Sequence, residues 1–173
     1  MNLRRLFVFF FLSVIISSCS VSQTNTSSRT EAVAQVNAVL DDLHRLAAAA
    51  NFNDYFNLYA DESVFIGTDA TEVWTKIQFM AYAKPHFDKG RSWSFTPLKR
   101  QVTLSKDGTI AWFDEVLDTQ MKICRGSGVL EQTKEGWKVR QYVLSMAIPN
   151  ALSKEVVKLK TSLEEPLIEE MKR

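Results

Sequence analysis

Cysteine and histidine are scarce in this sequence of 173 residues, which contains two of each. The histidines, His44 and His86, lie far apart and have no cysteine or carboxylate at the spacing of metal ligands, so we expect no metal site. With only Cys19 and Cys124, the chain cannot build the disulfide framework that stabilises small secreted domains. The fold must therefore be held by its apolar core, in which Cys124 is expected as an inert buried thiol.

An excess of charge of one sign is also missing. The sequence has 21 Lys and Arg against 20 Asp and Glu, and its formal net charge is +1. This balance gives no strong field for nucleic acid, which we do not expect as a partner. Phosphate-binding loops and the Gly-x-Ser-x-Gly motif of hydrolases are absent as well, and no cofactor is indicated. The length suits one domain with a sizeable core.

Only one long apolar run occurs, and it stands at the N-terminus. It covers residues 6–12 and continues in Val14, Ile15 and Ile16, after the positively charged pair Arg4-Arg5. This arrangement is typical of an export signal, and the run is too short to span a bilayer as a mature helix. We therefore expect residues 1–18 to be a signal peptide.

The end of this segment, Ile16-Ser17-Ser18-Cys19, resembles the lipobox of bacterial lipoproteins. The resemblance implies cleavage before Cys19 and lipidation of its sulfur, which would make the protein a lipid-anchored lipoprotein of the cell envelope. Ser20 resembles the residue found in lipoproteins sent to the outer membrane, on its periplasmic face in a Gram-negative host. Acylated Cys19 would leave Cys124 without a disulfide partner. An ordinary signal peptide, an uncleaved anchor helix and a twin-arginine signal at Arg4-Arg5 remain alternatives.

Helical periodicity dominates the first half of the chain. Residues 19–30 comprise the cysteine and a polar spacer without periodicity, which we expect to be flexible. Amphipathic helices are then predicted at residues 30–50, 52–59 and 73–87, with a short strand at 64–67 between the second and the third.

Alternation with a period of two replaces the helical pattern from Trp93 onward. Strands are predicted at residues 93–104, 110–122, 126–133 and 137–148. Turn sequences such as Lys106-Asp107-Gly108 join them into an antiparallel meander. Residues 150–173 are predicted to form a C-terminal amphipathic helix that Pro166 interrupts.

Three helices followed by long antiparallel strands indicate an α+β fold in which a strongly curved sheet wraps the helices around a pocket. Several segments carry a family resemblance: Asn53-Asp54-Tyr55-Phe56, Tyr59-Ala60-Asp61, Val64-Phe65-Ile66-Gly67-Thr68-Asp69, Trp74, Pro85-His86-Phe87, Ala111-Trp112-Phe113-Asp114-Glu115, Arg125-Gly126-Ser127-Gly128, Gly136-Trp137-Lys138 and Gln141-Tyr142. Together and in this order they resemble the SnoaL-like branch of the NTF2-like superfamily. The resemblance covers residues 31–149 and implies a cone-shaped α+β barrel with an internal cavity. Because this superfamily hosts enzymes, ligand binders and scaffolds, the fold does not carry the function across.

The mechanism of ketosteroid isomerase, a relative of this fold, is not expected. That enzyme uses a tyrosine and two aspartates. An alignment anchored on Tyr59-Ala60-Asp61 places Leu43, Gly67 and Gly128 at those three positions. None of these side chains can take up or donate a proton.

Four residues are candidates for acid–base catalysis, namely His44, Asp114, Glu115 and Tyr142. Asp114 and Glu115 are neighbours on a strand and point to opposite faces, so at most one of them enters the cone, and the pattern does not decide which. The structural alternative is an ion pair with Arg125 or Arg140. His44 lies on the apolar stripe of the first predicted helix, as a satisfied core histidine or as a general base.

Five residues are candidate ligand contacts, namely Asp69, Trp74, Trp112, Arg125 and Gly128. Each also has a structural interpretation. Asp69 could cap a turn, the tryptophans could belong to the core, and Gly128 could permit a bend of the sheet.

The sequence as a whole favours a membrane-anchored module that binds a small, largely apolar or aromatic ligand. Two alternatives stay open. One is a cofactor-free acid–base enzyme of the isomerase, cyclase or dehydratase type. The other is a homodimeric scaffold in which the sheet face forms the dimer and residues 152–163 are offered to a partner helix.

Overall fold

The computed structural model describes residues 20–173. The predicted signal peptide and Cys19 lie outside the described residues. The elements follow in the order α1 (Ser20–Ala48), α2 (Phe52–Asn57), β1 (Tyr59–Ile66), β2 (Val73–Thr75), α3 (Lys76–Asp88), β3 (Thr96–Leu104), β4 (Ile110–Thr119), β5 (Lys122–Thr133), β6 (Gly136–Met146), the 3-10 turn η1 (Asn150–Leu152) and α4 (Ser153–Met171). This α+β arrangement confirms the predicted fold class.

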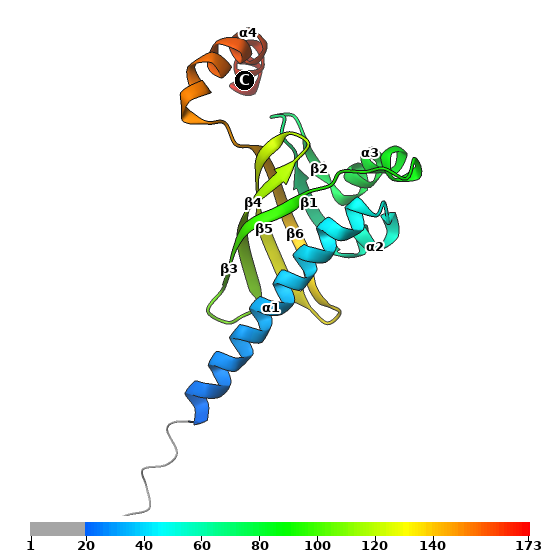
Figure 1. The fold of residues 1–173 in the computed structure, drawn as a ribbon, viewed down its shortest axis with the longest axis vertical. Coiled ribbons are helices and arrows are strands. Elements are labelled where there is room, and N and C mark those ends of the chain that lie inside the picture. The colour runs from blue at the N-terminus through cyan, green and yellow to red at the C-terminus, as the bar shows by residue number, and fades with distance from the viewer. Residues whose placement is uncertain (1–19) are drawn as a thin grey trace, which may run out of the picture.

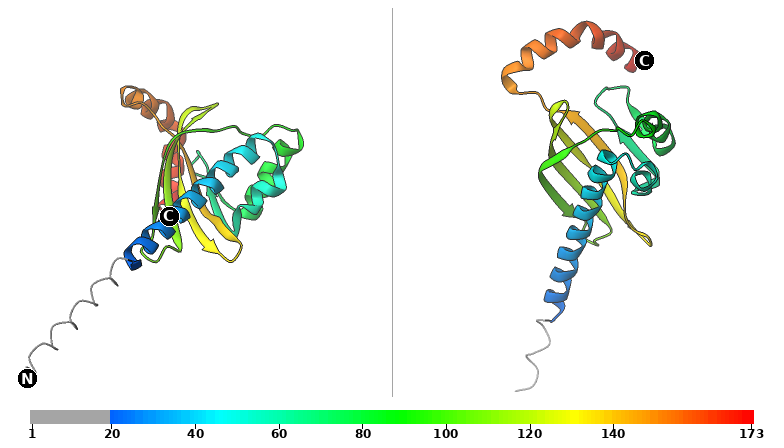
Figure 2. Two further views of the ribbon diagram at one scale, coloured as in Figure 1. Left: turned by 60° about the horizontal axis from the view of Figure 1, so that its bottom comes forward. Right: turned by 45° about the vertical axis from the view of Figure 1, so that its right-hand side comes forward.

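Six strands form one curved sheet in the order β2-β1-β6-β5-β4-β3. Helices α1, α2 and α3 lie on the same side of this sheet, inside its curve (Figure 1; Figure 2, left). The meander from β3 to β6 is antiparallel as predicted, but β1 pairs with β6 in parallel, so the sheet is mixed. A parallel pair needs a long crossover, and here the crossover comprises α3 and the four strands β2 to β5.

Helix α1 supplies one wall of the core. Its buried side chains Val36, Leu40, Leu43 and Ala47 recur at the spacing of one helical face. The opposite wall comes from the sheet, where β4 alternates strictly between buried and exposed residues. Aromatic side chains fill the space between these walls near α2 and α3, where they contact one another at many ring pairs.

The prediction that residues 20–30 form a flexible spacer is wrong, because α1 starts at Ser20 and not near Thr30. Arg29 contributes to this extension. Its guanidinium donates hydrogen bonds to the carbonyl oxygens of Leu104 and Ser105, at 3.3 and 3.1 Å, and so attaches the early turns of α1 to the end of β3. A polar composition alone did not reveal this contact, because the partners lie 75 and 76 residues away.

Other boundaries also differ from the prediction: β1 starts at Tyr59, β3 at Thr96 and β5 at Lys122. The third predicted helix starts only at Lys76, because Thr75 caps it: Thr75 Oγ1 accepts from the backbone of Gln78, and the Gln78 side chain accepts from the backbone of Thr75. The preceding residues Val73–Thr75 pair with β1 as strand β2. Helix α4 passes through Pro166 without ending. Because Pro166 has no N–H, the carbonyl four residues before it receives no hydrogen bond from position 166. This carbonyl lies on an exposed helix, where water can donate to it.

None of the helices in residues 20–173 combines the length and the apolar character that a membrane span requires.

Candidate functional site

A buried carboxylate stands at the centre of the cone. Glu115 lies midway along β4 on its inner face, and its side chain is 0% exposed. Its neighbour Asp114 points to the outer face, where its side chain is exposed and forms an ion pair with Arg125 at 3.0 Å. The structure therefore decides the question that the strand pattern left open: Glu115 enters the cone, and Asp114 has the alternative role of a surface ion pair.

Three side chains from three different elements donate hydrogen bonds to Glu115. His44 Nε2 on α1 and the Tyr142 hydroxyl on β6 each lie 2.9 Å from Oε1, and Arg100 Nε on β3 lies 2.8 Å from Oε2. Because an ionised carboxylate can only accept hydrogen bonds, Nε2 of His44 carries the proton. Three of the four predicted catalytic candidates thus meet in one cluster, together with Arg100.

Arg100 extends this cluster to the surface of α1. Its Nη1 donates to Asp41 Oδ1 at 2.7 Å and to the backbone oxygen of Asn37 at 3.3 Å. Asn37, Asp41 and His44 lie four and three residues apart, so they share one face of α1 beside its apolar stripe. The sequence analysis missed Arg100, although its position two residues from Val102 and four from Leu104 places it on the inner face of β3.

The electrostatics of the cluster keep Glu115 charged and Tyr142 neutral. Burial raises the pKa of the Glu115 carboxyl, but the interactions with His44 and Arg100 outweigh burial and hold this pKa below its ordinary value of 4.5. Burial also raises the pKa of the Tyr142 hydroxyl well above 10.0, and the negative charge of Glu115 adds to that shift. The cluster is therefore an ionised acceptor surrounded by fixed donors.

A glycine on β5 makes room for this cluster. Gly126 pairs with Glu115 across the β4–β5 ladder. A Cβ atom at Gly126 would lie 2.5 Å from the Tyr142 hydroxyl oxygen and 2.9 Å from Glu115 Cγ. Any side chain at this position would push the two hydrogen-bonded groups apart.

His44 retains one free ring nitrogen. Within residues 20–173, Nδ1 makes no hydrogen bond. This atom is not fully buried, since it is absent from the fully buried polar atoms without a partner. The ring packs edge-on against Phe95, with centroids 6.1 Å apart. Glu115 thus fixes the orientation of an imidazole whose other nitrogen can accept a proton.

An aromatic pocket adjoins the cluster at the open end of the cone. It measures about 170 Å³ and is lined by Phe65, Gly67, Thr68, Glu72, Trp74, Phe79, Tyr82, Trp93, Phe95, Gln120, Met121 and Leu144. Phe65 stacks on Tyr142 with ring centroids 5.9 Å apart, and Phe95 touches His44. The side chains that hold Glu115 in place therefore also support the back wall of the pocket.

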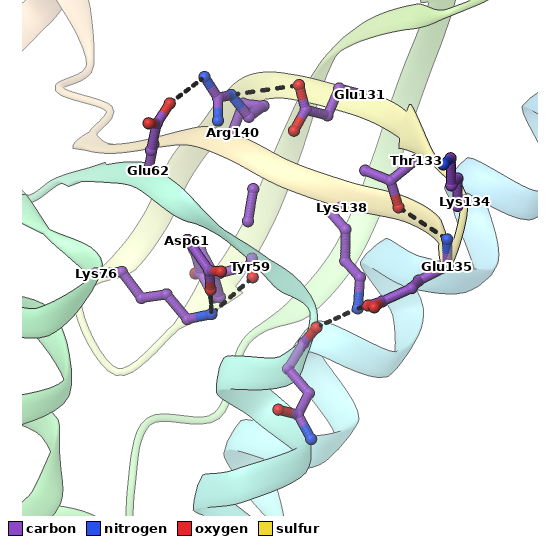
Figure 3. Close-up of a pocket in the computed structure, with 12 residues that line it drawn as sticks. Tyr59, Asp61, Glu62, Lys76, Glu131, Thr133, Lys134, Glu135, Lys138 and Arg140 are labelled. Atoms are coloured by element: carbon purple, nitrogen blue, oxygen red, sulfur yellow. Dashed lines mark hydrogen bonds and ion pairs between the residues drawn. The ribbon is translucent and has the colours of Figure 1, made fainter.

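A second hollow lies at the other end of the sheet, beside β1 and β6 (Figure 3). It measures about 570 Å³ and is lined mostly by charged groups that pair with one another. Lys76 donates to Asp61 at 3.1 Å and to the backbone oxygen of Tyr59 at 2.9 Å, and Arg140 lies 3.5 Å from both Glu62 and Glu131. These cations are neutralised by carboxylates, so the hollow offers no net charge to a ligand.

The predicted ligand contacts are not gathered in one place. Trp74 lines the aromatic pocket. Asp69 instead accepts hydrogen bonds from the backbone and hydroxyl of Thr71, at 2.9 and 2.6 Å, and so caps a turn. Trp112 is 48% exposed on the outer face of the sheet, the face that also carries Asp114 on β4 and Arg125 on β5. The outward direction of these side chains excludes them from the cone.

Gly128 has a packing role rather than a place at the pocket. A Cβ atom there would lie 2.1 Å from the backbone oxygen of Gln141. The glycine lets β5 and β6 approach closely where their register shifts, next to Val129. In the part of the chain that the structure describes, no three His, Cys, Asp or Glu side chains are grouped as metal ligands.

Comparison with known proteins gives one family match and many structural ones. A family model described as "SnoaL-like domain" matches residues 36–149. No curated protein matches in sequence. An NTF2-like protein with a cystatin-like fold from Novosphingobium aromaticivorans is similar in structure, with a TM-score of 0.62 and 10% identity over 82% of this chain and 98% of its own.

Two other similar structures have names that refer to enzymes. A candidate aromatic ring hydroxylase from Novosphingobium aromaticivorans has a TM-score of 0.60 and 11% identity, over 69% of this chain and 92% of its own. A candidate dehydratase of the NTF2-like family from Streptomyces avermitilis has a TM-score of 0.57 and 14% identity, over 68% of this chain and 96% of its own. At these identities the similarity establishes the fold alone.

Replacing Glu115 by Gln tests how much the buried carboxylate stabilises the fold. We expect Glu115→Gln to lower the free energy of unfolding at pH 7 by about 3 kcal/mol, because Arg100 loses its buried counter-charge. A carboxyl with a lowered folded-state pKa stabilises the fold above its unfolded pKa and loses that effect as the pH falls through the folded pKa. The difference in the free energy of unfolding between wild type and variant should therefore shrink as the pH falls below 4.5, the ordinary pKa of this carboxyl.

Denaturant unfolding at several pH values measures this difference. Asp114→Asn is the matched control, since it removes the neighbouring carboxylate on the exposed face and should cost less than about 1 kcal/mol. Equal losses in the two variants would contradict the role assigned to Glu115.

Proposed function

We propose that this chain, which belongs to the family of SnoaL-like domains, binds a small aromatic molecule in its cone, in the pocket beside Trp74. We propose further that the protein is a lipoprotein of the cell envelope, attached to the membrane through Cys19. The two parts of this proposal have separate support and separate tests.

The composition of the pocket wall carries the first part. Aromatic residues from β1, β2, α3 and the segment before β3 make up half of the lining, and the polar groups are those of Thr68, Glu72 and Gln120. An apolar lining with a few polar groups is typical of small-molecule sites. A volume of about 170 Å³ is close to that of an apolar cavity of about 150 Å³ that holds benzene, so the pocket suits a small aromatic molecule.

Filling the pocket from β6 tests the binding proposal. Leu144 lines the pocket, and Leu144→Phe adds bulk inside it. We expect indole and phenol to bind the wild-type chain with a Kd of about 1 mM or lower, and Leu144→Phe to weaken binding at least about tenfold. Isothermal titration calorimetry on residues 20–173, which contain every core residue, measures both values.

Val143→Phe is the matched control for this variant. It makes a similar change one residue away, on the outer face of the same strand, and should leave the Kd unchanged. Absence of binding for both rings, or equal weakening in the two variants, would count against the pocket as the site.

A second function is favoured by the His44–Glu115 pair. A carboxylate that orients an imidazole is the arrangement of a general base and its supporting residue, and Nδ1 of His44 is free to accept a proton. Dehydration is the reaction that fits this pair. With the ring of Phe95 displaced by the substrate, His44 Nδ1 would take a proton from the carbon next to a carbonyl, and a double bond would form to the next carbon as its C–O bond breaks. The protonated His44 would then return this proton to the departing hydroxide, which leaves as water.

Small β-hydroxy ketones with one aromatic ring are suitable test substrates, since the product enone absorbs in the ultraviolet. We expect His44→Ala to abolish turnover, because it removes the base, while indole still binds, because the aromatic residues that line the pocket are unchanged. His86→Ala, which changes the exposed histidine of α3, should retain full activity. Turnover that survives His44→Ala would exclude this mechanism.

The membrane part of the proposal is supported by the lipobox-like sequence and by the course of α1. The helix begins at Ser20, directly after Cys19, and runs away from the sheet at its N-terminal end (Figure 1; Figure 2, right). A lipid on Cys19 would therefore hold the domain on a helical stalk. Eleven helical residues extend about 16 Å, which is shorter than a stretched chain of the same length.

Metabolic labelling with an alkyne-tagged fatty acid tests lipidation. We expect the full chain to incorporate the label and to sediment with membranes, and Cys19→Ser to lose both properties. The only other cysteine is buried, so Cys124→Ser is the control and should keep the label. Label that persists in Cys19→Ser would refute lipidation at this residue. In a host with two membranes, we expect fractionation to find the protein in the outer one.

A further inference from the structure

The aromatic pocket contains a carboxylate but no cationic side chain. Among residues 20–173, those that line the pocket include Glu72, and none of them is Lys, Arg or His. Glu72 is thus the one charged residue in a lining that is otherwise aromatic, apolar or neutral. The sign of this charge bears on which ligands the pocket can hold.

The pairing of β1 with β2 places Glu72 on the pocket side. Trp74 on β2 pairs with Phe65 on β1, and both side chains line the pocket. Glu72 lies two residues before Trp74, and side chains two apart on an extended chain share one face. The pairing continues beyond both strands, since the N–H of Gly67 donates to the backbone oxygen of Glu72 at 2.8 Å. Gly67 therefore lies opposite Glu72, as Phe65 lies opposite Trp74.

Gly67 leaves room for the carboxylate of Glu72. A Cβ atom at Gly67 would lie 2.1 Å from Glu72 Oε2, so any side chain there would displace the carboxylate. The backbone N–H of Asp69 donates to the same oxygen at 3.2 Å. A glycine and a backbone hydrogen bond thus hold this carboxylate beside the aromatic wall.

The negative charge of Glu72 is not neutralised by the rest of the described chain. In residues 20–173, Glu72 forms no ion pair, and the hydrogen bond from Asp69 is the one that its carboxylate accepts. The carboxylates of the second hollow differ, because Glu62 and Glu131 both pair with Arg140 (Figure 3). The aromatic pocket therefore offers an unpaired anion.

The rings around Glu72 add to the negative potential of the pocket. Trp74 stacks on Tyr82 with ring centroids 4.5 Å apart, and Phe65 stacks on Phe79 at 4.0 Å. The face of an aromatic ring is negative and attracts cations, most strongly in tryptophan. A cleft that combines one sign of charge with walls of low polarity attracts the opposite charge and repels its own.

We propose that the aromatic ligand of this pocket is a cation, an arylalkyl ammonium compound whose ring lies among the aromatic residues and whose nitrogen lies beside Glu72. This inference rests on the aromatic pocket being the binding site, and it adds the charge of the ligand to the proposed function. A protonated amine donates charge-assisted hydrogen bonds to a carboxylate, and these are stronger than hydrogen bonds between neutral groups.

Three ligands with the same ring and the same two-carbon chain test the sign of the charge. Phenethylamine is a cation at pH 7, phenethyl alcohol is neutral, and hydrocinnamate is an anion. In calorimetric titrations of residues 20–173, we expect the amine to bind about tenfold more tightly than the alcohol, and hydrocinnamate to bind more weakly than both. Added salt should raise the Kd of the amine and leave that of the alcohol unchanged.

Glu72→Gln tests whether this preference comes from Glu72. The variant keeps the size of the side chain and removes its charge, so the Kd of phenethylamine should rise about tenfold and that of phenethyl alcohol should stay the same. Glu62→Gln is the matched control, because it removes an exposed carboxylate at the second hollow and should keep the preference for the amine. Circular dichroism checks that both variants are folded.

The outcomes separate this inference from the proposed function. Equal affinities for the amine and the alcohol, both weakened by Leu144→Phe, would overturn the inference and leave the pocket as the binding site. A preference for hydrocinnamate would also overturn it, and so would a preference for the amine that Glu72→Gln does not reduce. Absence of binding for all three ligands would overturn both the inference and the proposed function.

Discussion

The hydrogen-bonded carboxylate of Glu115 is the constraint on which the rest of this structure depends. Removing such a charge from water costs several kcal/mol, and the cost is offset only when fixed donors surround the oxygens. Here the donors are His44, Arg100 and Tyr142, which come from α1, β3 and β6. These elements therefore cannot move independently of β4, and the position of α1 against the curved sheet is set by polar contacts as well as by apolar packing.

The same constraint extends to the pocket. Tyr142 donates to Glu115 with its hydroxyl and stacks on Phe65 with its ring, while His44 packs against Phe95. Phe65 and Phe95 belong to the pocket wall. An aromatic ligand would thus meet rings that are supported from behind by an ionised network, which reduces the ordering that binding requires. Fold stability and the proposed ligand recognition would thus draw on one set of side chains.

Much of the fold follows from local patterns, and the exceptions have identifiable causes. The helical stripe of Val36 and Leu40 predicted the buried face of α1, and the alternation along β4 predicted two unlike faces without deciding which of them is buried. The early start of α1 was not predicted, because it depends on Arg29, whose acceptor, the carbonyl oxygen of Ser105, lies 76 residues further along the chain. In the candidate site, too, residues with a local signal were predicted and a residue whose role depends on distant partners was missed. His44, Glu115 and Tyr142 were found from their types and positions, whereas Arg100 was missed because its role exists only once β3 pairs with β4.

The sequence by itself determined the order of the elements, their amphipathic faces and the family, because these depend on the local periods of the helix and the strand and on motifs along the chain. Only the tertiary structure decided that Glu115 and not Asp114 faces the cone, and that the carboxylate meets a histidine 71 residues away. The physical reason is that the period of a strand fixes the alternation of its side chains but not the sign of the face. The sheet's curvature and its contact with α1 choose that sign.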